Sequence, residues 1–138
     1  MEGQSTISEE RRSYSAGQPE HPLIPAGRVS GADVYGAEGE KIGHVEDVAL
    51  EKVDGNVAYA ILSLGGFLGL GARYHPVPWS MLRYDIERRG YVIPCTKDQL
   101  ETAPTIDREE LSGWDDAALR DGLYAYYAPY GAQPYWMP

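Results

Sequence analysis

Residues 54–64, Asp-Gly-Asn-Val-Ala-Tyr-Ala-Ile-Leu-Ser-Leu, decide the fold of this chain. The pair Asp54-Gly55 is its strongest turn signal, because glycine adopts a positive φ without steric cost. The eight residues from Val57 to Leu64 are apolar on both alternating faces. A strand with this pattern is covered on both sides. The segment therefore predicts a central strand that begins at a tight turn.

Short strands and a second glycine turn precede this segment. A strand over residues 29–35 and a long strand over 41–52 are predicted to form a hairpin. Residues 38–40 supply the turn, since Gly39 is free to adopt a positive φ.

Two further strand regions follow the central strand. Residues 73–79 contain Pro76 and Pro78, which cannot donate ladder hydrogen bonds, so this segment is expected at an edge, a bulge or a barrel corner. Residues 81–87 and 91–95 are expected to form a last hairpin across 88–90.

Short strands separated by glycine turns predict an all-β fold, a small barrel of five or six strands. The alternating apolar positions give an expected core of Ile42, Val45, Val48, Leu50, Val57, Tyr59, Ile61, Leu62, Leu82 and Ile86.

Short helices are expected after the strands. Thr96 and Gln99 have the spacing of a capping box, so a short helix begins here and ends by Pro104. A second helix is predicted over 114–121, with Gly122 ending it.

The composition divides the chain into three parts. Residues 1–22 are polar and are expected to be a flexible tail, 23–104 form the β domain, and 105–138 form a helical and aromatic extension. The last seventeen residues, 122–138, contain no charged side chain but five tyrosines and a tryptophan. When exposed, such a segment presents a large aromatic surface that favours association. We therefore expect it to pack on its own barrel or on a second copy of the chain.

Charge and cysteine content narrow the choice of partners and compartment. The formal net charge is −9, which disfavours direct contact with nucleic acid or anionic lipid. One cysteine, Cys95, cannot form an intrachain disulfide, so a cytoplasmic location is expected. The longest apolar run, 58–64, is too short to cross a bilayer, and the N-terminus has no apolar segment typical of a signal sequence.

The stretch 29–104 resembles the PRC-barrel family, which includes the cytoplasmic domain of the photosynthetic reaction-centre H subunit and a domain of the ribosome maturation factors. The resemblance lies in the order and spacing of Val34-Tyr35, the segment Gly39–Val48, the glycine-rich segment Gly65–Gly71, Val77-Pro78-Trp79-Ser80, and Thr96–Leu100 with Pro104. It implies a small barrel without known catalytic residues that serves as an assembly or adaptor module, and it implies no ligand site. The chain lacks the membrane helix of the H subunit and the additional N-terminal domain of the maturation factors. The resemblance therefore does not imply that this chain acts in photosynthesis or in ribosome assembly.

The glycine-rich segment 65–71 invites a nucleotide-binding interpretation. A P-loop requires Lys-Ser/Thr after its last glycine and then a helix, whereas here Arg73-Tyr74-His75-Pro76 follows and is typical of a strand. We expect a tight corner between strands, with Phe67, Leu68 and Leu70 folded over one barrel end or into a neighbouring subunit.

Metal and catalytic sites are not expected. His21, His44, His75 and Cys95 have no spacing typical of metal ligands. Cys95 is interpreted as a small buried hydrophobe, although its place before a helix leaves a reactive thiol as the alternative. Glu46 and Asp47 are neighbours on a strand and point to opposite faces, so they do not form a carboxylate pair.

We therefore expect a non-catalytic protein-interaction module without a cofactor. Its expected partners are a second copy of itself, another protein, or both. Two alternatives stay open, namely an accessory factor in RNA metabolism or ribosome maturation that docks on a basic protein, and a small-ligand carrier or enzyme. The candidate interaction residues are Phe67, Leu68, Leu70, Trp114, Tyr124, Tyr126, Tyr127, Tyr130, Tyr135 and Trp136.

Overall fold

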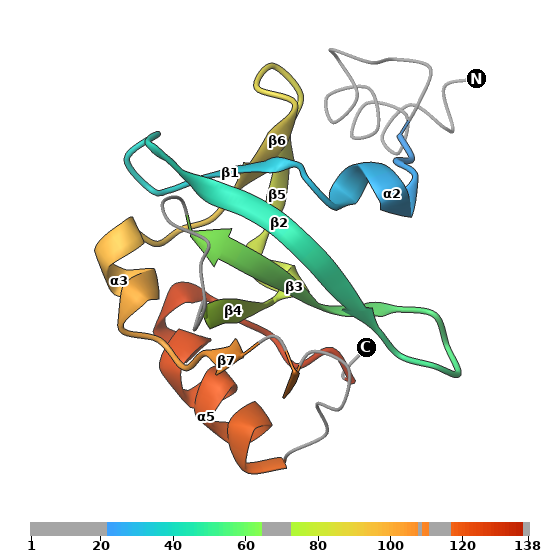
Figure 1. Ribbon diagram of the computed structural model, residues 1–138, viewed down its shortest axis with the longest axis vertical. Helices are drawn as coiled ribbons and strands as arrows, with labels where there is room; N and C mark the ends of the chain where they lie inside the picture. The colour runs from blue at the N-terminus through green and yellow to red at the C-terminus, as the bar shows by residue number, and fades with distance from the viewer. Residues whose placement is uncertain (1–21, 65–72, 108, 111–116, 137–138) are drawn as a thin grey trace, which may run out of the picture.

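One seven-stranded sheet organises the protein (Figure 1). A computed structural model describes residues 22–64, 73–107, 109–110 and 117–136. The strands are β1 (Asp33–Tyr35), β2 (Lys41–Leu50), β3 (Val57–Leu64), β4 (Arg73–Pro78), β5 (Arg83–Asp85), β6 (Gly90–Val92) and β7 (Ile106–Asp107). The helical elements are α2 (Ala26–Val29), η2 (Trp79–Met81), α3 (Lys97–Glu101), α5 (Ala117–Tyr127) and η3 (Ala128–Tyr130).

The strand order in this sheet is β5-β6-β1-β2-β3-β4-β7. Neighbouring strands are antiparallel except β1 and β6, which are parallel and pair Val34 with Tyr91. Within the described residues no pairing joins β7 to β5, so the sheet curls without closing. The all-β barrel-type architecture is confirmed, with seven strands where five or six were expected. One of the additional strands, β7, is only two residues long and follows α3.

The predicted glycine turns are confirmed. Gly39 has a φ of 86° between β1 and β2, and Gly55 has a φ of 78° between β2 and β3. The prediction of a first strand beginning at Val29 is wrong, because residues 26–29 form the short helix α2 instead. The helix follows Pro25, whose fixed φ suits a helix start, and a turn at Gly31 separates it from β1.

The two prolines of β4, Pro76 and Pro78, lie beyond the part of the strand that pairs with β7. Pro76 pairs in register with Ile61 of β3, whereas β7 pairs only with Arg73 and Tyr74. The ladder to β7 thus stops before the first residue that lacks an N–H group. In the sheet order β4 is one strand in from the edge, but among the described residues its prolines have no partner on the β7 side, which agrees with the expectation of an edge, a bulge or a barrel corner.

The last hairpin is shorter than predicted, and its turn uses another residue. Arg89 has a φ of 57°, while Gly90 lies within β6. A Cβ atom on Gly90 would lie 2.6 Å from the Asp33 carbonyl oxygen of β1. Glycine is therefore needed for the close approach of β6 to β1 and not for the turn itself.

The predicted core is partly right. Ile42, Val45, Tyr59, Ile61 and Leu62 are buried, and Val48 and Leu82 pack against them. Val57 and Ile86 are only half-buried, and Leu50 is 52% exposed. A register shift between Ala49 and Leu50, at the far end of the β2–β3 hairpin, carries Leu50 out of the core.

The capping box is confirmed. The Gln99 backbone N–H donates to Thr96 Oγ1 at 3.2 Å, and the Thr96 N–H donates to Gln99 Oε1 at 2.8 Å. The helix α3 that they start ends at Glu101, before Pro104 as expected.

The second helix extends further than predicted. Gly122 does not end it, because α5 continues to Tyr127, while residues 114–116 lie outside the described part of the chain. An interior glycine costs a helix only about 1 kcal/mol relative to alanine. Complete burial of Leu123 and Tyr127 in the following turns outweighs that cost.

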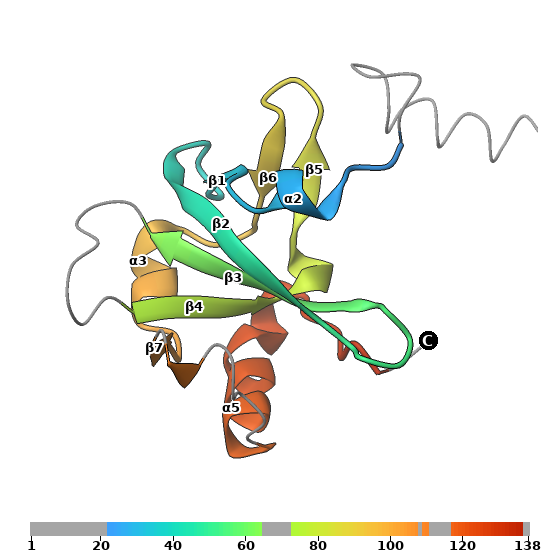
Figure 2. The ribbon, with the colours of Figure 1, turned by 45° about the vertical axis from the view of Figure 1, so that its right-hand side comes forward.

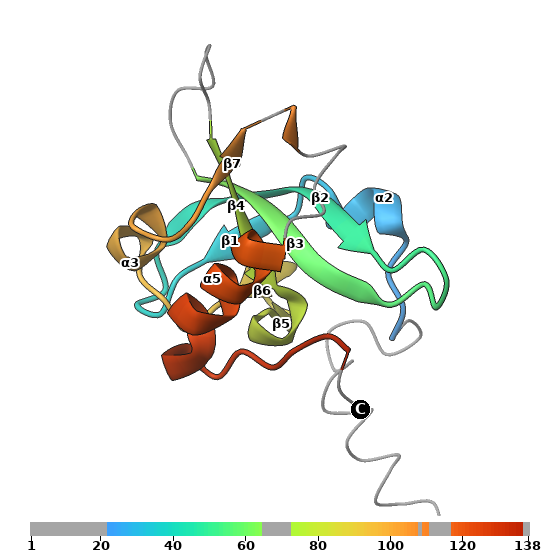
Figure 3. The ribbon, with the colours of Figure 1, turned by 90° about the horizontal axis from the view of Figure 1, so that it is seen from below.

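The two faces of the β3–β4 pair have different covers. Residues that pair directly across antiparallel strands share a face, so Tyr59 with Pro78 lies on one side and Leu62 with His75 on the other. We call the side of Tyr59 the outer face, and α5 packs on it (Figure 3). The β5–β6 hairpin rises away from the β3–β4 pair (Figure 2).

Candidate interaction surface

The C-terminal residues 117–136, which we call the C-terminal cover, pack on the outer face of the same chain. Leu123 and Tyr127 of α5 are fully buried, and Tyr124, Tyr126, Tyr130 and Tyr135 are partly buried against the core. Of the two expected arrangements for the aromatic segment, the structure has the one on its own barrel. The cover therefore belongs to the hydrophobic core of one chain.

The C-terminal end of α5 is tied to α3 by Tyr126. Its hydroxyl donates to the Gln99 carbonyl oxygen, which also accepts from Thr102 Oγ1 at 3.1 Å. The two hydroxyl oxygens lie 2.6 Å apart. This contact uses a carbonyl at the end of a short helix, where backbone acceptors lack helical partners.

The segment after η3 is held by fewer contacts. The Gln133 N–H donates to Ser80 Oγ at 2.9 Å, and the Tyr135 N–H donates to the Tyr124 hydroxyl at 3.2 Å. The ring of Tyr59 on β3 contacts the rings of Tyr124 and Tyr135, with centroids 5.9 and 5.6 Å away. Tilted and edge-to-face pairs of this kind are favourable beyond their area of burial.

The last described aromatic residue is the most exposed of the set. Trp136 is 48% exposed although its ring contacts Tyr135 and Tyr124. The Arg120 guanidinium lies 4.8 Å above the indole ring. Trp136 is thus fixed in place while half of its surface faces solvent. The candidates Phe67, Leu68, Leu70 and Trp114 lie outside the described residues.

The sequence reasoning missed a second exposed apolar group, at the end of the β2–β3 hairpin. Leu50 pairs in register with Val57, and Val53 at the hairpin tip is 95% exposed. Val53 stands between Lys52 and Asp54, so an apolar residue within a charged turn was the available signal. Leu50 was assigned to the core because it lies two residues after Val48 and so continues the alternation of core-facing positions along β2.

The exposed residues of the hairpin and of the C-terminal segment lie on the same face of the sheet. Val57 and Tyr59 are two residues apart on β3 and share a face, and Tyr59 contacts Tyr135, which contacts Trp136. In Figures 1 and 2 the C-terminal segment runs toward the β2–β3 hairpin. We call the surface of Leu50, Val57, Tyr135 and Trp136 the hairpin patch.

The open edge of β2 is blocked against strand addition. β1 pairs with β2 only as far as His44, with two further hydrogen bonds at Val45. Beyond this point the Asp47 carboxylate accepts from the Val48 N–H at 2.8 Å, and the strand carries register shifts on either side. Charged side chains and bulges of this kind discourage edge-to-edge pairing. This edge is therefore poorly suited to pairing with another strand.

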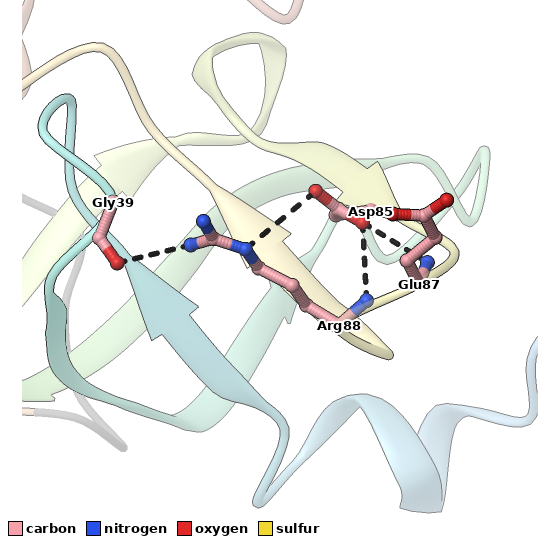
Figure 4. Close-up of polar contacts among 4 residues, drawn as sticks. All are labelled: Gly39, Asp85, Glu87 and Arg88. Atoms are coloured by element: carbon pink, nitrogen blue, oxygen red, sulfur yellow. Dashed lines mark hydrogen bonds and ion pairs between the residues drawn. The ribbon is translucent and has the colours of Figure 1, made fainter.

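Arg88 connects the tips of two hairpins (Figure 4). Its Nη1 donates to the Gly39 carbonyl oxygen at 3.0 Å, and its guanidinium lies 4.8 Å above the Tyr35 ring. Asp85 Oδ1 accepts from the N–H groups of Glu87 and Arg88 at 3.0 and 3.1 Å. These contacts hold the β1–β2 and β5–β6 turns together.

The titratable candidates Cys95, His75 and His44 have different environments. Cys95 is buried, which confirms its interpretation as a small core residue, and burial raises the pKa of its thiol to about 11. His75 is buried on the inner face, and burial lowers its pKa to about 4. His44 lies on β2 with its Nε2 3.2 Å from Glu46 Oε1. Within the described residues, which do not include His21, no three His, Cys, Asp or Glu side chains are placed to hold a metal ion.

Comparison with known families agrees with this architecture. The family model of the PRC-barrel domain matches residues 23–100. The chain belongs to the PRC-barrel family. The matched PRC-barrel region ends within α3, so β7 and the C-terminal cover follow it. No curated protein matches the chain. Within the described residues, no helix has both the length and the apolar character needed to span a membrane.

Proposed function

We propose that this PRC-barrel protein is a non-catalytic interaction module that self-associates through the hairpin patch. The observation that carries the proposal is that two half-exposed apolar side chains, Leu50 and Trp136, lie on the same face of the sheet, where Trp136 contacts an anchored aromatic cluster. Single exposed apolar residues are common on soluble proteins, but contiguous ones mark interaction sites. Tyrosine and tryptophan are also enriched in protein interfaces.

The chemistry of the rest of the chain supports a binding role over a catalytic one. PRC-barrel domains are in general non-catalytic. The buried Cys95 and His75 have pKa values shifted toward their neutral forms, which is the effect of an apolar core. Their burial serves packing of the core, which supports a role for the protein in surface contact.

A cytoplasmic location is part of the same proposal. The single cysteine and its buried thiol support a reducing compartment. Cell fractionation with an antibody to the protein tests this, and recovery outside the cytoplasmic fraction contradicts it.

Sedimentation velocity over a range of concentrations tests self-association. We expect the wild-type protein to associate, and Leu50→Glu or Trp136→Glu to weaken association by roughly tenfold or more, because an unpaired carboxylate is strongly unfavourable in an apolar interface. Leu23→Glu is the matched control, since Leu23 is an exposed leucine outside the hairpin patch. Thermal melting of each variant checks that the fold is retained. A wild-type protein that sediments as a monomer at every concentration contradicts the proposal.

A further inference from the structure

The last described residues, 133–136, form a strap whose binding site is built by other parts of the chain. Gln133 is held by Ser80 of η2, and Tyr135 is held by the Tyr124 hydroxyl and the Tyr59 ring. Trp136 is held by Tyr124 and Arg120 of α5. The residues that receive the strap thus come from β3, η2 and α5, so the strap of a second copy can make the same contacts.

The turn that leads into the strap is suited to act as a hinge. Gly131 has a φ of 91°, and no heavy atom lies within 4 Å of the position that a Cβ would take. Glycine adopts positive and negative φ about equally, so the chain can take another direction here without steric cost. The hydrogen bonds that close the turn run from the Gly131 N–H to the Ala128 carbonyl and from the Ala132 N–H to the Tyr127 carbonyl. Opening the hinge therefore breaks few contacts, namely these two hydrogen bonds.

We propose that two copies associate by exchanging this strap, each laying residues 133–136 into the site of the other. This exchange rests on the self-association proposed above and identifies the strap as the segment through which two copies associate. Exchange of an identical element preserves every contact of the strap and is a low-cost route to a dimer.

Contacts that only the dimer has favour the exchanged form over the closed monomer. Trp136 ends the strap and is 48% exposed, and Leu50 of the hairpin patch is 52% exposed, so an exchanged strap brings apolar surface of the second copy to the hairpin patch. Burying these side chains adds apolar contact that the closed monomer cannot make. Net charge opposes the approach of two copies, so the dimer should be stronger at higher salt.

Disulfide trapping distinguishes exchange from closure on the same chain. One protein carries Ser80→Cys and the other carries Gln133→Cys, both with Cys95→Ala, and the two are mixed and oxidised. We expect a covalent heterodimer, because Ser80 and Gln133 are in direct contact when the strap is bound. A mixture of Leu23→Cys with Gln133→Cys is the control and should give no such heterodimer.

The double variant Ser80→Cys/Gln133→Cys, oxidised at low concentration, closes the strap on its own chain. We expect this locked protein to sediment as a monomer under conditions where the reduced form is dimeric. If it remains dimeric, or if the mixed single variants give no heterodimer, exchange is overturned while self-association through the patch stands. If the wild-type protein is monomeric throughout, both proposals fail.

Gly131→Ala tests the hinge without cysteines. A side chain at φ of 91° strains the closed turn, and relief of that strain on exchange should strengthen dimerisation by roughly tenfold or more. An unchanged dissociation constant would show that Gly131 is not the hinge and contradict the exchange.

Discussion

Two substitutions at Tyr127 separate the contribution of its ring from that of its hydroxyl. The side chain belongs to α5 of the C-terminal cover and is fully buried, and its hydroxyl has no hydrogen-bond partner among the described residues. Burial accordingly raises the pKa of this hydroxyl. The ring should stabilise the fold, whereas the hydroxyl should not.

The two free energies can be worked from this environment. Removing the ring in Tyr127→Ala should lower the free energy of unfolding by about 3–5 kcal/mol, as for other large aromatic residues in cores. A buried hydroxyl without a partner costs about 1–3 kcal/mol, so Tyr127→Phe, which removes it, should stabilise the protein by up to about 3 kcal/mol. Tyr130→Ala is the control, because Tyr130 is only partly buried and should cost less than Tyr127→Ala.

Urea unfolding, followed by circular dichroism, measures these differences in the free energy of unfolding. The comparison requires that the slope of this free energy against urea concentration is the same for each variant. A loss of more than about 1 kcal/mol in Tyr127→Phe would show that the hydroxyl has a partner. A loss below about 0.5 kcal/mol in Tyr127→Ala would show that α5 does not cover the outer face, and the reasoning would be refuted.

Two further predictions concern the strands. Ile61 is buried in β3 between β2 and β4, so Ile61→Ala should cost about 2–5 kcal/mol in urea unfolding, and a cost below about 0.5 kcal/mol would place the central strand elsewhere. Burial lowers the pKa of His75 to about 4 from an ordinary 6.5, so the unfolded chain binds a proton between these pH values and the folded protein does not. Its contribution to stability should therefore be complete above pH 6.5 and fall by about 3 kcal/mol as the pH drops to 4. His75→Leu should flatten this part of the stability profile, and an unchanged profile would show that His75 is accessible to protons in the folded state.

Local signals in the sequence predicted the structure where local chemistry decides it. Gly39 and Gly55 mark turns, and Thr96 with Gln99 marks a helix start, because each acts within a few residues of its own position. Gly122 is a helix stop by the same rules, but tertiary burial of the following turn of α5 overrides it.

The candidate site was harder to predict than the turns. The charge-free aromatic segment correctly indicated a packed C-terminus, whereas nothing in its composition distinguishes packing on the same chain from packing on another. Leu50 was misassigned because a register shift of one residue reverses the face of a strand. Such shifts depend on pairing with a neighbour and leave no trace in the alternation of β2 itself.

The position of the C-terminal cover has a consequence for biosynthesis. β3 and β4 are translated well before α5, so their outer face emerges without the segment that later shields Tyr59 and Ile61. At ordinary rates of synthesis that interval lasts on the order of seconds, ample time for contacts between nascent chains. The prolines of β4 and the capped edge of β2 then protect the growing chain as well as the finished one, because both limit pairing with strands of a neighbouring polypeptide.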